Sequence, residues 1–448
     1  MSTADVVIVG AGVVGTAIAR TLSAYAVDCV LVDAANDVGT GTSKANTAIL
    51  HTGFDAKPGT LESRLLVRGS GLLREYAAAA GIPVERTGAL LVAWTGEQLA
   101  SLPAVAGQAR RNGYAAIRPV PVPELYAREP RLGPGALGAL EIPDESIICP
   151  WTTPLAFATE AVLGGVKLQL NTWVTGVTPG GPAHELTTSR GALRARWVIN
   201  SAGLGSDSVD ALFGGDGFVI RPRRGELIVY DKLARSLLGS ILLPVPTART
   251  KGVLVAPTVY GNVLLGPTAE DIDDPSDTST TAAGLSSLLA AGHRILPGLA
   301  AEEVTATYAG LRAATEHADY QIYVDGKQRY ACVAGIRSTG LSASLGIAEH
   351  VVAELAEAGL PLVSRGRPAQ VPVMPYIGEA GIRPYQVAGE IVCHCERVTR
   401  GEIEDAMSSV IPPDDLGGLR RRTRAMNGRC QGFYCAARVS RLFAGGRA

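Results

Sequence analysis

Residues 5–33 read DVVIVGAGVVGTAIARTLSAYAVDCVLVD and decide the fold of the first part of the chain. The short apolar run at 5–9 is typical of a buried parallel strand. Residues 16–26 are rich in helix formers, and a second apolar run at 29–32 ends on Asp33. The stretch therefore predicts a strand, a turn, a helix and a second strand, which together form the unit that binds a dinucleotide.

The glycines between the first strand and the helix support this interpretation. Gly10 allows a tight turn, Gly12 lets the backbone approach a pyrophosphate, and Gly15 lets the helix pack against the strand. Phosphates bind at the positive N-terminal end of such a helix. Asp33 stands at the distance where an acid accepts hydrogen bonds from the adenosine ribose. Because a strand, a helix and an acid accompany the glycines, we expect a bound dinucleotide here.

A second strand, glycine turn and helix start occur at 331–350, which reads ACVAGIRSTGLSASLGIAEH. A simple nicotinamide-binding domain has no need of this element. In a flavin protein, the N-terminus of such a helix can face the pyrimidine end of the ring and stabilise the negative charge of the reduced form. The small-residue loop at 39–53, GTGTSKANTAILHTG, can also bring backbone amides close to a cofactor. These features favour FAD over NAD.

Length and composition exclude several classes of protein. At 448 residues the chain exceeds one ordinary core, so two or three units are expected. A hydrophobic content of 47% and a formal net charge of −1 argue against nucleic acid as the main partner. No apolar run reaches the roughly 18 residues of a membrane span, and the first strand begins too early to leave room for a signal peptide. We expect a cytoplasmic protein, with peripheral association at the inner membrane face left open.

Four of the seven cysteines lie in two close pairs, Cys393 with Cys395 and Cys430 with Cys435. Two pairs of thiolates can bind zinc or an iron–sulfur cluster. One intervening residue is tighter than the two to four that are usual for zinc, and four lies at the edge of that range. The spacing therefore favours a 2Fe–2S cluster, with zinc and free thiols as the alternatives. The other cysteines are expected to be core thiols: Cys29, Cys149 and Cys332.

A group of arginines precedes the second cysteine pair: Arg420, Arg421, Arg422 and Arg424. A solvated helix face is one interpretation. Compensation of an anionic cluster, or docking of an acidic partner, is the other. The sequence favours neither.

The predicted fold class is α/β, with a Rossmann-like FAD-binding domain interleaved with an antiparallel-sheet substrate domain and a small helical iron–sulfur domain at the C-terminus. Residues 84–93 look like one strand, and 219–270 alternate as antiparallel strands do. Residues 118–150, rich in proline and glycine, are expected to cross between two lobes. The expected boundaries are an oxidoreductase unit at 1–365 (FAD-binding segments 1–80, 150–215 and 326–365; substrate-domain segments 81–149 and 216–325), a linker at 366–387 and an iron–sulfur domain at 388–448.

Residues 1–365 resemble the D-amino-acid-oxidase-type FAD superfamily, and within it the branch of L-2-hydroxyglutarate and glycerol-3-phosphate dehydrogenases. The segments TSKANTAILHTGFDAKPGTLESRL and GIPVERTGALLVA look like the hydroxyglutarate group, whereas GPTAED, YAGLR and GIRSTGLSASLGIA occur in both groups. The run at 46–48 is Asn-Thr-Ala, where the hydroxyglutarate group commonly has Asn-Ser-Gly. Residues 388–440 resemble the bacterioferritin-associated-ferredoxin-like domain, and all four cysteine positions match.

The resemblance implies which residues hold the cofactors. For FAD they are Gly10, Gly12, Gly15 and Asp33 at the ADP half, Thr42, Ser43, Asn46 and Thr47 at the pyrophosphate and flavin, Val174, Ala202 and Gly203 towards the adenine side, and Gly335, Ile336, Gly340, Leu341 and Ser342 along the isoalloxazine ring. For the 2Fe–2S cluster they are Cys393, Cys395, Cys430 and Cys435.

The resemblance also implies an FAD-dependent dehydrogenase that oxidises an anionic secondary alcohol, such as L-2-hydroxyglutarate or glycerol 3-phosphate, by hydride transfer to flavin N5. His51 matches the active-site histidine and is suited to take the hydroxyl proton. Arg312 matches the active-site arginine and is suited to bind a carboxylate or phosphate. Electrons would leave through the cluster to a protein acceptor, such as a companion flavoprotein or a membrane subunit. The alternatives are an amine or imino-acid (opine-type) dehydrogenase subunit and an electron-transfer subunit.

Overall fold

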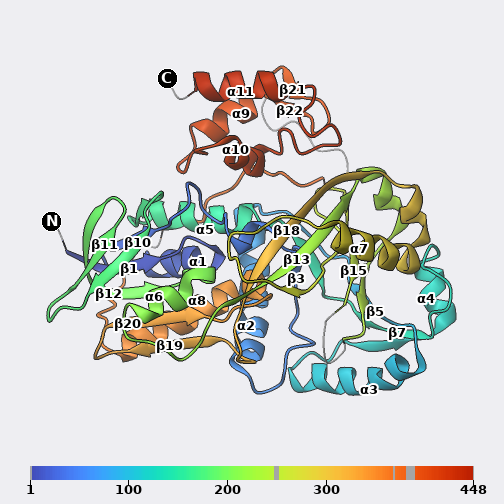
Figure 1. The fold of residues 1–448 in the computed structure, drawn as a ribbon, viewed down its shortest axis with the longest axis horizontal. Helices are drawn as coiled ribbons and strands as arrows, with labels where there is room; N and C mark the ends of the chain where they lie inside the picture. The colour runs from blue at the N-terminus through green and yellow to red at the C-terminus, as the bar shows by residue number, and fades with distance from the viewer. Residues whose placement is uncertain (1–2, 247–251, 367–368, 380–388, 447–448) are drawn as a thin grey trace.

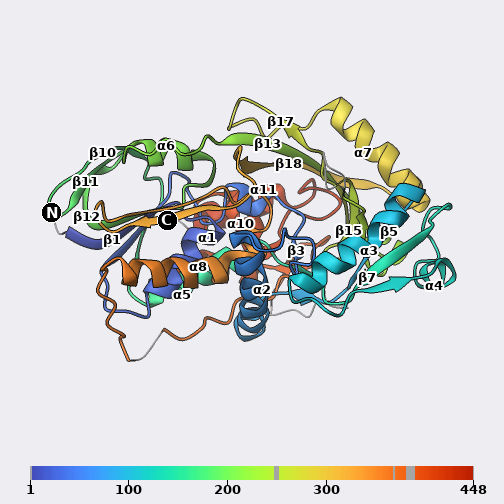
Figure 2. The ribbon, with the colours of Figure 1, turned by 90° about the horizontal axis from the view of Figure 1, so that it is seen from below.

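The computed structural model describes residues 3–246, 252–366, 369–379 and 389–446 (Figure 1). Two large sheets lie side by side, and a small C-terminal unit lies over them (Figures 1 and 2). The arrangement confirms the α/β class with a parallel-centred sheet, an antiparallel sheet and a small C-terminal unit. The domain boundaries stay predictions, and parts of the expected linker at 366–387, as well as residue 388, lie outside the described residues.

The first sheet has eight strands: β1 (Thr3–Val9), β2 (Cys29–Val32), β9 (Lys167–Gln169), β10 (Val174–Thr178), β11 (His184–Thr188), β12 (Gly191–Asn200), β19 (Gln321–Asp325) and β20 (Tyr330–Ala334). β1 lies between β2 and β12, and all three run parallel. β20 also pairs in parallel with β12. Every residue of β2 is buried, as a strand covered on both faces requires.

Helices from distant parts of the sequence cover this sheet: α1 (Val13–Leu22), α2 (Leu61–Ala80), α5 (Thr152–Leu163), α6 (Ser206–Ala211) and α8 (Gly340–Glu357). α1 packs against α5 and α8, and α8 packs against α2. The two glycine turns of the sequence precede α1 and α8, and these two helices are neighbours. The two turns therefore lie close together in the fold.

The second sheet has nine strands: β5 (Ala89–Ala93), β6 (Arg118–Val120), β7 (Gly138–Ile142), β13 (Arg221–Tyr230), β14 (Ile241–Pro244), β15 (Leu254–Pro257), β16 (Val263–Gly266), β17 (Glu270–Asp271) and β18 (Val304–Ala314). Its strands pair antiparallel except for β14 with β5. Its helices are α3 (Gly96–Arg111), α4 (Val122–Arg128) and α7 (Ala282–Ile295) (Figure 2). The 3-10 turns of the chain are η1 (Thr42–Lys44), η2 (Gly203–Gly205), η3 (Lys232–Leu237) and η4 (Pro297–Ala301).

A third, small sheet is formed by three short strands from distant parts of the sequence. Its strands are β3 (Ile49–Leu50), β4 (Val84–Glu85) and β8 (Ser146–Ile148), with β8 in the middle. β3 and β8 run antiparallel, so the residue after β3 lies opposite the residue before β8. This pairing brings together two positions that are far apart in the sequence.

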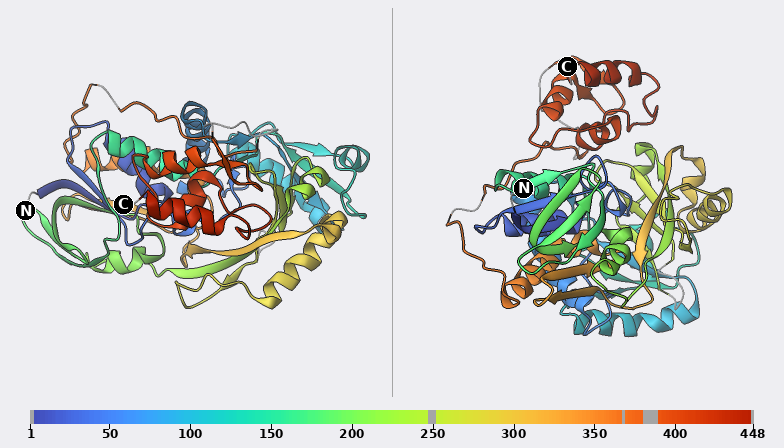
Figure 3. Two further views of the ribbon diagram at one scale, coloured as in Figure 1. Left: turned by 90° about the horizontal axis from the view of Figure 1, so that it is seen from above. Right: turned by 60° about the vertical axis from the view of Figure 1, so that its left-hand side comes forward.

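The C-terminal unit consists of β21 (Ile391–Cys393), β22 (Val398–Thr399), α9 (Arg400–Met407), α10 (Leu416–Thr423) and α11 (Ala436–Gly445). It has its own core, which includes Val392, Ile403, Leu419 and Val439. Figure 3 shows this unit standing apart from the two large sheets, and in Figure 1 α10 is its helix nearest to them. A separate core indicates a domain in its own right.

One expectation from the sequence is wrong. Residues 84–93 form two strands in different sheets, because Gly88 adopts a positive φ of 64° and turns the chain between them. The stretch at 118–150 passes from the second sheet to the small third sheet, and it does so through β6, α4, β7 and β8. Prolines and glycines there separate short strands instead of preventing them.

Among the described residues, no helix combines the length and the apolar character that a membrane span requires. The isolated cysteines Cys29, Cys149 and Cys332 are buried, as expected for core thiols.

Candidate functional site

The turn between β1 and α1 accepts only glycine at two of its positions. Gly10 has a φ of 107°, and a Cβ added there would lie 2.4 Å from the carbonyl oxygen of Ser201. A Cβ on Gly15 would lie 1.9 Å from the carbonyl oxygen of Gly10. Both distances are far inside van der Waals contact, so the tight turn and the close helix depend on glycine. The start of α1 follows this turn and is where a phosphate is expected.

Asp33 follows β2 beside this turn. Its Oδ2 accepts a hydrogen bond from the backbone N of Ala11 (2.5 Å), and its Oδ1 accepts one from the N of Ala35 (2.8 Å). Burial raises the pKa of Asp33, although these two hydrogen bonds oppose the shift. The backbone N of Thr172 donates to the carbonyl oxygen of Asp33 (2.7 Å), which brings the chain just before Val174 to the same end of the sheet.

Two further predicted positions lie at the other side of the glycine turn. The Cα of Ala202 would be 3.0 Å from a Cβ on Gly10. Gly203 has a φ of 60° and begins the turn after β12. The predicted ADP-binding residues thus come from the ends of three neighbouring strands, at the edge where open α/β sheets bind ligands.

Ser43 connects the 42–47 loop to the start of α1. Its Oγ accepts a hydrogen bond from the backbone N of Val13 (3.0 Å), and a Cβ on Gly12 would lie 3.3 Å from that Oγ. The Nδ2 of Asn46 donates to the carbonyl oxygen of Ser43 (2.8 Å), and its Oδ1 accepts from the N of Ala48 (2.8 Å). The asparagine therefore holds the loop, which also contains Thr47, in a fixed shape beside the helix N-terminus.

The second glycine turn meets the same loop through Ser342. Gly335 ends β20 with a φ of 69°, and α8 begins at Gly340. The Oγ of Ser342, in the first turn of α8, accepts a hydrogen bond from the backbone N of His51 (2.9 Å) and donates to the carbonyl oxygen of Ile49 (3.2 Å). The predicted flavin-binding turn and the predicted catalytic histidine are therefore neighbours.

The remaining predicted positions of this turn pack tightly. A Cβ on Gly340 would lie 2.8 Å from the Cγ2 of Ile336, and Leu341 is buried. Glycine at position 340 therefore leaves room for the side chain of Ile336.

His51 is held by a buried carboxylate that the sequence analysis missed. The Nδ1 of His51 lies 3.0 Å from the Oε2 of Glu145, which is fully buried. The other oxygen, Oε1, accepts hydrogen bonds from the N (2.7 Å) and Oγ1 (2.9 Å) of Thr52. An ionised carboxylate only accepts, so the imidazole donates through Nδ1 and Nε2 is the ring nitrogen that can take up a proton.

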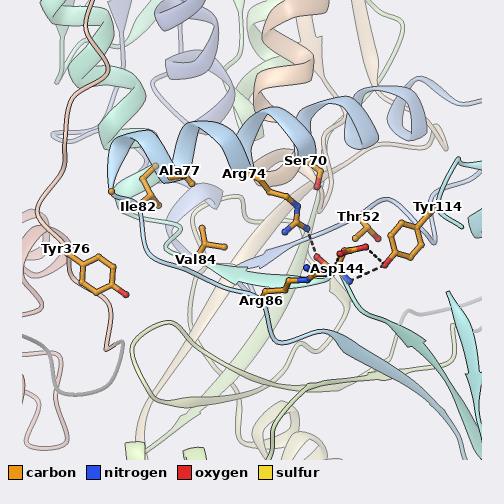
Figure 4. A pocket seen from close by; sticks show the side chains of 12 residues that line it. Thr52, Ser70, Arg74, Ala77, Ile82, Val84, Arg86, Tyr114, Asp144 and Tyr376 are labelled. Carbon is orange, nitrogen blue, oxygen red and sulfur yellow. Dashed lines mark hydrogen bonds and ion pairs between the residues drawn. The ribbon is translucent and has the colours of Figure 1, made fainter. Parts of the chain in front are cut away.

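The residues on either side of Glu145 are also fixed. Arg74 donates through Nη2 to the carbonyl oxygen of Asp144 (2.5 Å) and through Nη1 to the Oγ of Ser146 (2.8 Å). The hydroxyl of Tyr114 donates to the Oδ2 of Asp144 (3.0 Å). Figure 4 shows Arg74, Tyr114 and Asp144 in a pocket of about 760 Å³, whose lining residues include none of the predicted site residues. The pocket therefore lies next to the support of His51, not at the predicted flavin site.

Replacing Glu145 by glutamine tests whether it positions His51. We expect kcat to fall roughly 10- to 100-fold, the usual cost of removing the partner that orients a functional imidazole, with little change in KM. The bound flavin spectrum should stay the same. The matched control is Glu129→Gln, since Glu129 is also buried but binds the backbone of Gly239 and Ser240 in the other lobe. A fall in both variants, or loss of FAD from Glu145→Gln, would point to a structural role only.

Arg312 lies on β18 and is the candidate anion-binding residue. It pairs with Arg223 of β13, and a Cβ on Gly225 would lie 2.9 Å from its Nη2, so glycine makes room for the guanidinium. Nη1 makes only a long contact of 3.5 Å to the carbonyl oxygen of Thr268. Burial, and to a smaller extent the charge of Arg223, lowers the pKa of Arg312. Within the described residues, no carboxylate pairs with this partly buried cation.

β18 lies directly against the 42–47 loop. The Oγ1 of Thr42 donates to the carbonyl oxygen of Leu311 (2.6 Å), next to Arg312. The hydroxyl of Tyr308 donates to the carbonyl oxygen of Asn46 (2.9 Å). The 42–47 loop therefore contacts both the start of α1 and the strand that carries Arg312.

The four C-terminal cysteines converge as two pairs. The thiols of Cys395 and Cys430 share a hydrogen bond, and those of Cys393 and Cys435 share another. Each pair joins the two sequence motifs, which suits a cluster of two irons held by four thiolates. In the part of the chain that is described, no group of three or more metal-ligating side chains is arranged for a single metal ion. Four thiolates from two motifs are the donor set that a 2Fe–2S cluster requires.

Three of the four arginines near the second cysteine pair form ion pairs inside the chain, which contradicts the interpretation as a solvated helix face. Arg421 and Arg422 bind Asp37, which follows β2, with N–O distances of 2.7 and 2.8 Å. Arg424 binds the buried Glu396 (2.5 Å). The acidic partners of these three arginines are therefore residues of the same chain and not groups on another molecule.

Comparisons with known proteins agree with this geometry. The family model described as "FAD dependent oxidoreductase" matches residues 5–354, and the one described as "BFD-like [2Fe-2S] binding domain" matches residues 391–444. Glycerol 3-phosphate dehydrogenase from Caloramator mitchellensis is 34% identical over 98% of this chain and 94% of its own length. That alignment is long enough to include the cysteine-bearing domain.

Two further relatives match the oxidoreductase part. Human mitochondrial L-2-hydroxyglutarate dehydrogenase is 28% identical over 60% of this chain and 61% of its own length. The FAD-bound structure of L-alpha-glycerophosphate oxidase from Mycoplasma pneumoniae has a TM-score of 0.79 and 27% identity, covering 84% of this chain and all of that one. The chain therefore belongs to the FAD-dependent oxidoreductase family and ends in a BFD-like 2Fe–2S binding domain.

Proposed function

We propose that the protein is a dehydrogenase that oxidises the secondary alcohol of glycerol 3-phosphate, and that electrons leave the chain through the 2Fe–2S cluster. The observation that carries the choice of an anionic substrate is Arg312, a partly buried guanidinium without an acidic partner among the described residues. The relative that matches 98% of the chain is a glycerol 3-phosphate dehydrogenase. An unpaired, partly buried guanidinium is suited to bind an anion such as a phosphate or a carboxylate through paired hydrogen bonds.

The chemistry at the alcohol needs a base and a hydride acceptor. FAD supplies the acceptor when bound. His51 takes the hydroxyl proton at Nε2, and Glu145 then stabilises the imidazolium through its hydrogen bond to Nδ1. Arg312 binds the phosphate and fixes the alcohol carbon in place. The site residues around the two glycine turns hold the cofactor so that this carbon can approach it.

Electron exit depends on the C-terminal domain. We propose Cys393, Cys395, Cys430 and Cys435 as the ligands of the cluster, and a protein as the final acceptor, either a companion flavoprotein or a membrane subunit. A one-electron carrier at the end of the chain favours transfer to another protein over direct reduction of oxygen. The proposal therefore distinguishes this protein from the glycerophosphate oxidases that it resembles.

The experiment is an anaerobic absorbance titration of the purified protein with both cofactors bound. Glycerol 3-phosphate is expected to bleach the flavin band, and glycerol, which lacks the anion, is the matched control. L-2-hydroxyglutarate is the second candidate, because the hydroxyglutarate dehydrogenases also match the chain. Bleaching by that compound alone would replace the substrate and keep the mechanism. Bleaching by amino or imino acids alone, or rapid peroxide formation with glycerol 3-phosphate, would overturn the proposal.

A further inference from the structure

A packed contact connects the cluster domain to the flavin-binding loop. On the cluster side, Glu396 follows the cysteine Cys395 and is almost fully buried. Its Oε2 accepts hydrogen bonds from Nε (2.7 Å) and Nη2 (2.5 Å) of Arg424, which is itself only 3% exposed. A buried, doubly bonded pair of this kind fixes the guanidinium plane.

Two aromatic rings continue this contact into the FAD-binding half. The guanidinium carbon of Arg424 lies 4.3 Å from the ring centre of Tyr260. Tyr260 stacks on Trp151, with ring centres 4.8 Å apart and planes inclined by 19°. The Nε1 of Trp151 donates to the carbonyl oxygen of Lys44 (3.1 Å), within the 42–47 loop. Stacked rings and a cation over a ring face prefer a defined relative geometry.

Asp37 secures the two halves beside this contact. It is 1% exposed and receives hydrogen bonds from Arg421 and from both terminal nitrogens of Arg422. Burial alone would raise the pKa of Asp37, but the hydrogen bonds and charges of these arginines outweigh it and hold the pKa below its usual value. The carboxylate therefore stays ionised at neutral pH. Lys232 adds a second link, because its Nζ lies 3.2 Å from the Oε2 of Glu396.

We propose that electrons pass from the flavin-binding half to the 2Fe–2S domain of the same chain across the contact formed by Trp151, Tyr260 and Arg424, and that the Asp37–Arg421–Arg422 ion pairs hold this contact closed. The inference rests on the proposed exit of electrons through the cluster. Transfer between bound redox groups falls steeply with the gap between them, so a packed and fixed contact is the favourable place to cross.

The electron balance follows from the two cofactors. Flavin reduced by two electrons gives one of them to the cluster, where one ferric ion becomes ferrous, and a flavin proton is released to water. The second electron can follow once a one-electron acceptor outside the chain has oxidised the cluster again. Without such an acceptor, the transfer stops after one electron per chain.

The test uses the full chain with both cofactors, and light with a sacrificial donor reduces the flavin in the absence of substrate. The electron paramagnetic resonance signal of the reduced cluster is then followed in time. We expect Trp151→Leu to slow the appearance of this signal at least tenfold, with unchanged FAD and iron content, and Trp151→Phe to restore most of the rate. Because no alcohol is oxidised, the result does not depend on the choice of substrate.

The ion pairs give an independent second test if Trp151→Leu does not fold. The double variant Arg421→Gln/Arg422→Gln is expected to slow cluster reduction and to make its rate sensitive to salt. The matched control is Arg400→Gln, since Arg400 pairs with Glu404 inside the cluster domain. Cluster reduction at the wild-type rate in Trp151→Leu, or in the double variant, overturns the proposal.

Discussion

His51→Asn is expected to lower the rate of flavin reduction by glycerol 3-phosphate by about 10²- to 10⁴-fold, the usual contribution of a positioned general base. The physical reason is that asparagine cannot take up the hydroxyl proton, although it can still hydrogen-bond to Glu145. Anaerobic stopped-flow absorbance at saturating substrate measures the step directly. The FAD content and the rate of flavin reduction by light should remain those of the wild type.

His317→Asn is the matched control, because His317 is a half-exposed histidine whose Nε2 hydrogen-bonds to the carbonyl oxygen of Gly217, away from Glu145. It should react like the wild type. Full-speed flavin reduction in His51→Asn would remove His51 from the role of base and leave it as a packing residue beside the flavin.

Arg312→Met is expected to reduce kcat/KM for glycerol 3-phosphate by about 30-fold to several thousandfold, because removing one partner of a buried charge pair costs about 2–5 kcal/mol. Arg312→Lys should fall between this variant and the wild type, since lysine keeps the charge but loses the two-pronged hydrogen bonding. Steady-state kinetics with an artificial electron acceptor give these values.

The decisive comparison is between charged and neutral substrates. If Arg312 binds the phosphate, the advantage of glycerol 3-phosphate over glycerol should nearly vanish in Arg312→Met, while the low rate with glycerol changes little. Arg68→Met controls for the loss of an arginine as such, because Arg68 pairs with Glu349 on an exposed helix surface. An equal loss with both substrates would make Arg312 a structural residue.

The elements around the candidate site that are complete within short stretches of sequence could be predicted from it. The strand–glycine–helix units at 5–33 and 331–350 follow from local spacing, and the structure places both turns beside neighbouring helices. The loop at 42–47 was also recognisable from its small residues. Such features require no knowledge of which distant segments pair, because each is complete within about thirty residues.

Glu145 could not be found in this way. It lies in a turn with the sequence PDES, which looks like any exposed connection between strands. Only the pairing of β3 with β8 brings it to His51, across 94 residues of sequence. An acid between two apolar runs was a weak signal, and nothing local distinguished it from an ordinary turn residue.

The arginines of α10 show the same limit on a larger scale. Their number and spacing were visible in the sequence, but their partner Asp37 lies 384 residues from Arg421. A charge run in isolation suggests solvent or an external ligand, because the sequence does not show which surface of the chain it will meet. The prediction of a single strand at 84–93 was wrong for a local reason. The strand pattern looks continuous in the sequence, but Gly88 adopts a positive φ that ends one strand before the next begins.

The ion pairs of Asp37 make the FAD-binding part of the chain depend on the C-terminal domain. In the intact chain its carboxylate is buried against two arginines of the last sixty residues. Cutting the chain after residue 365 would leave that charge without either counter-ion, on a surface shaped to be covered. An acid at this position therefore gains its two buried ion pairs only when the additional module is present. Among relatives, we expect Asp37 and the arginine pair to occur together or to be absent together. The residue at position 37 should then indicate whether a relative carries the C-terminal domain.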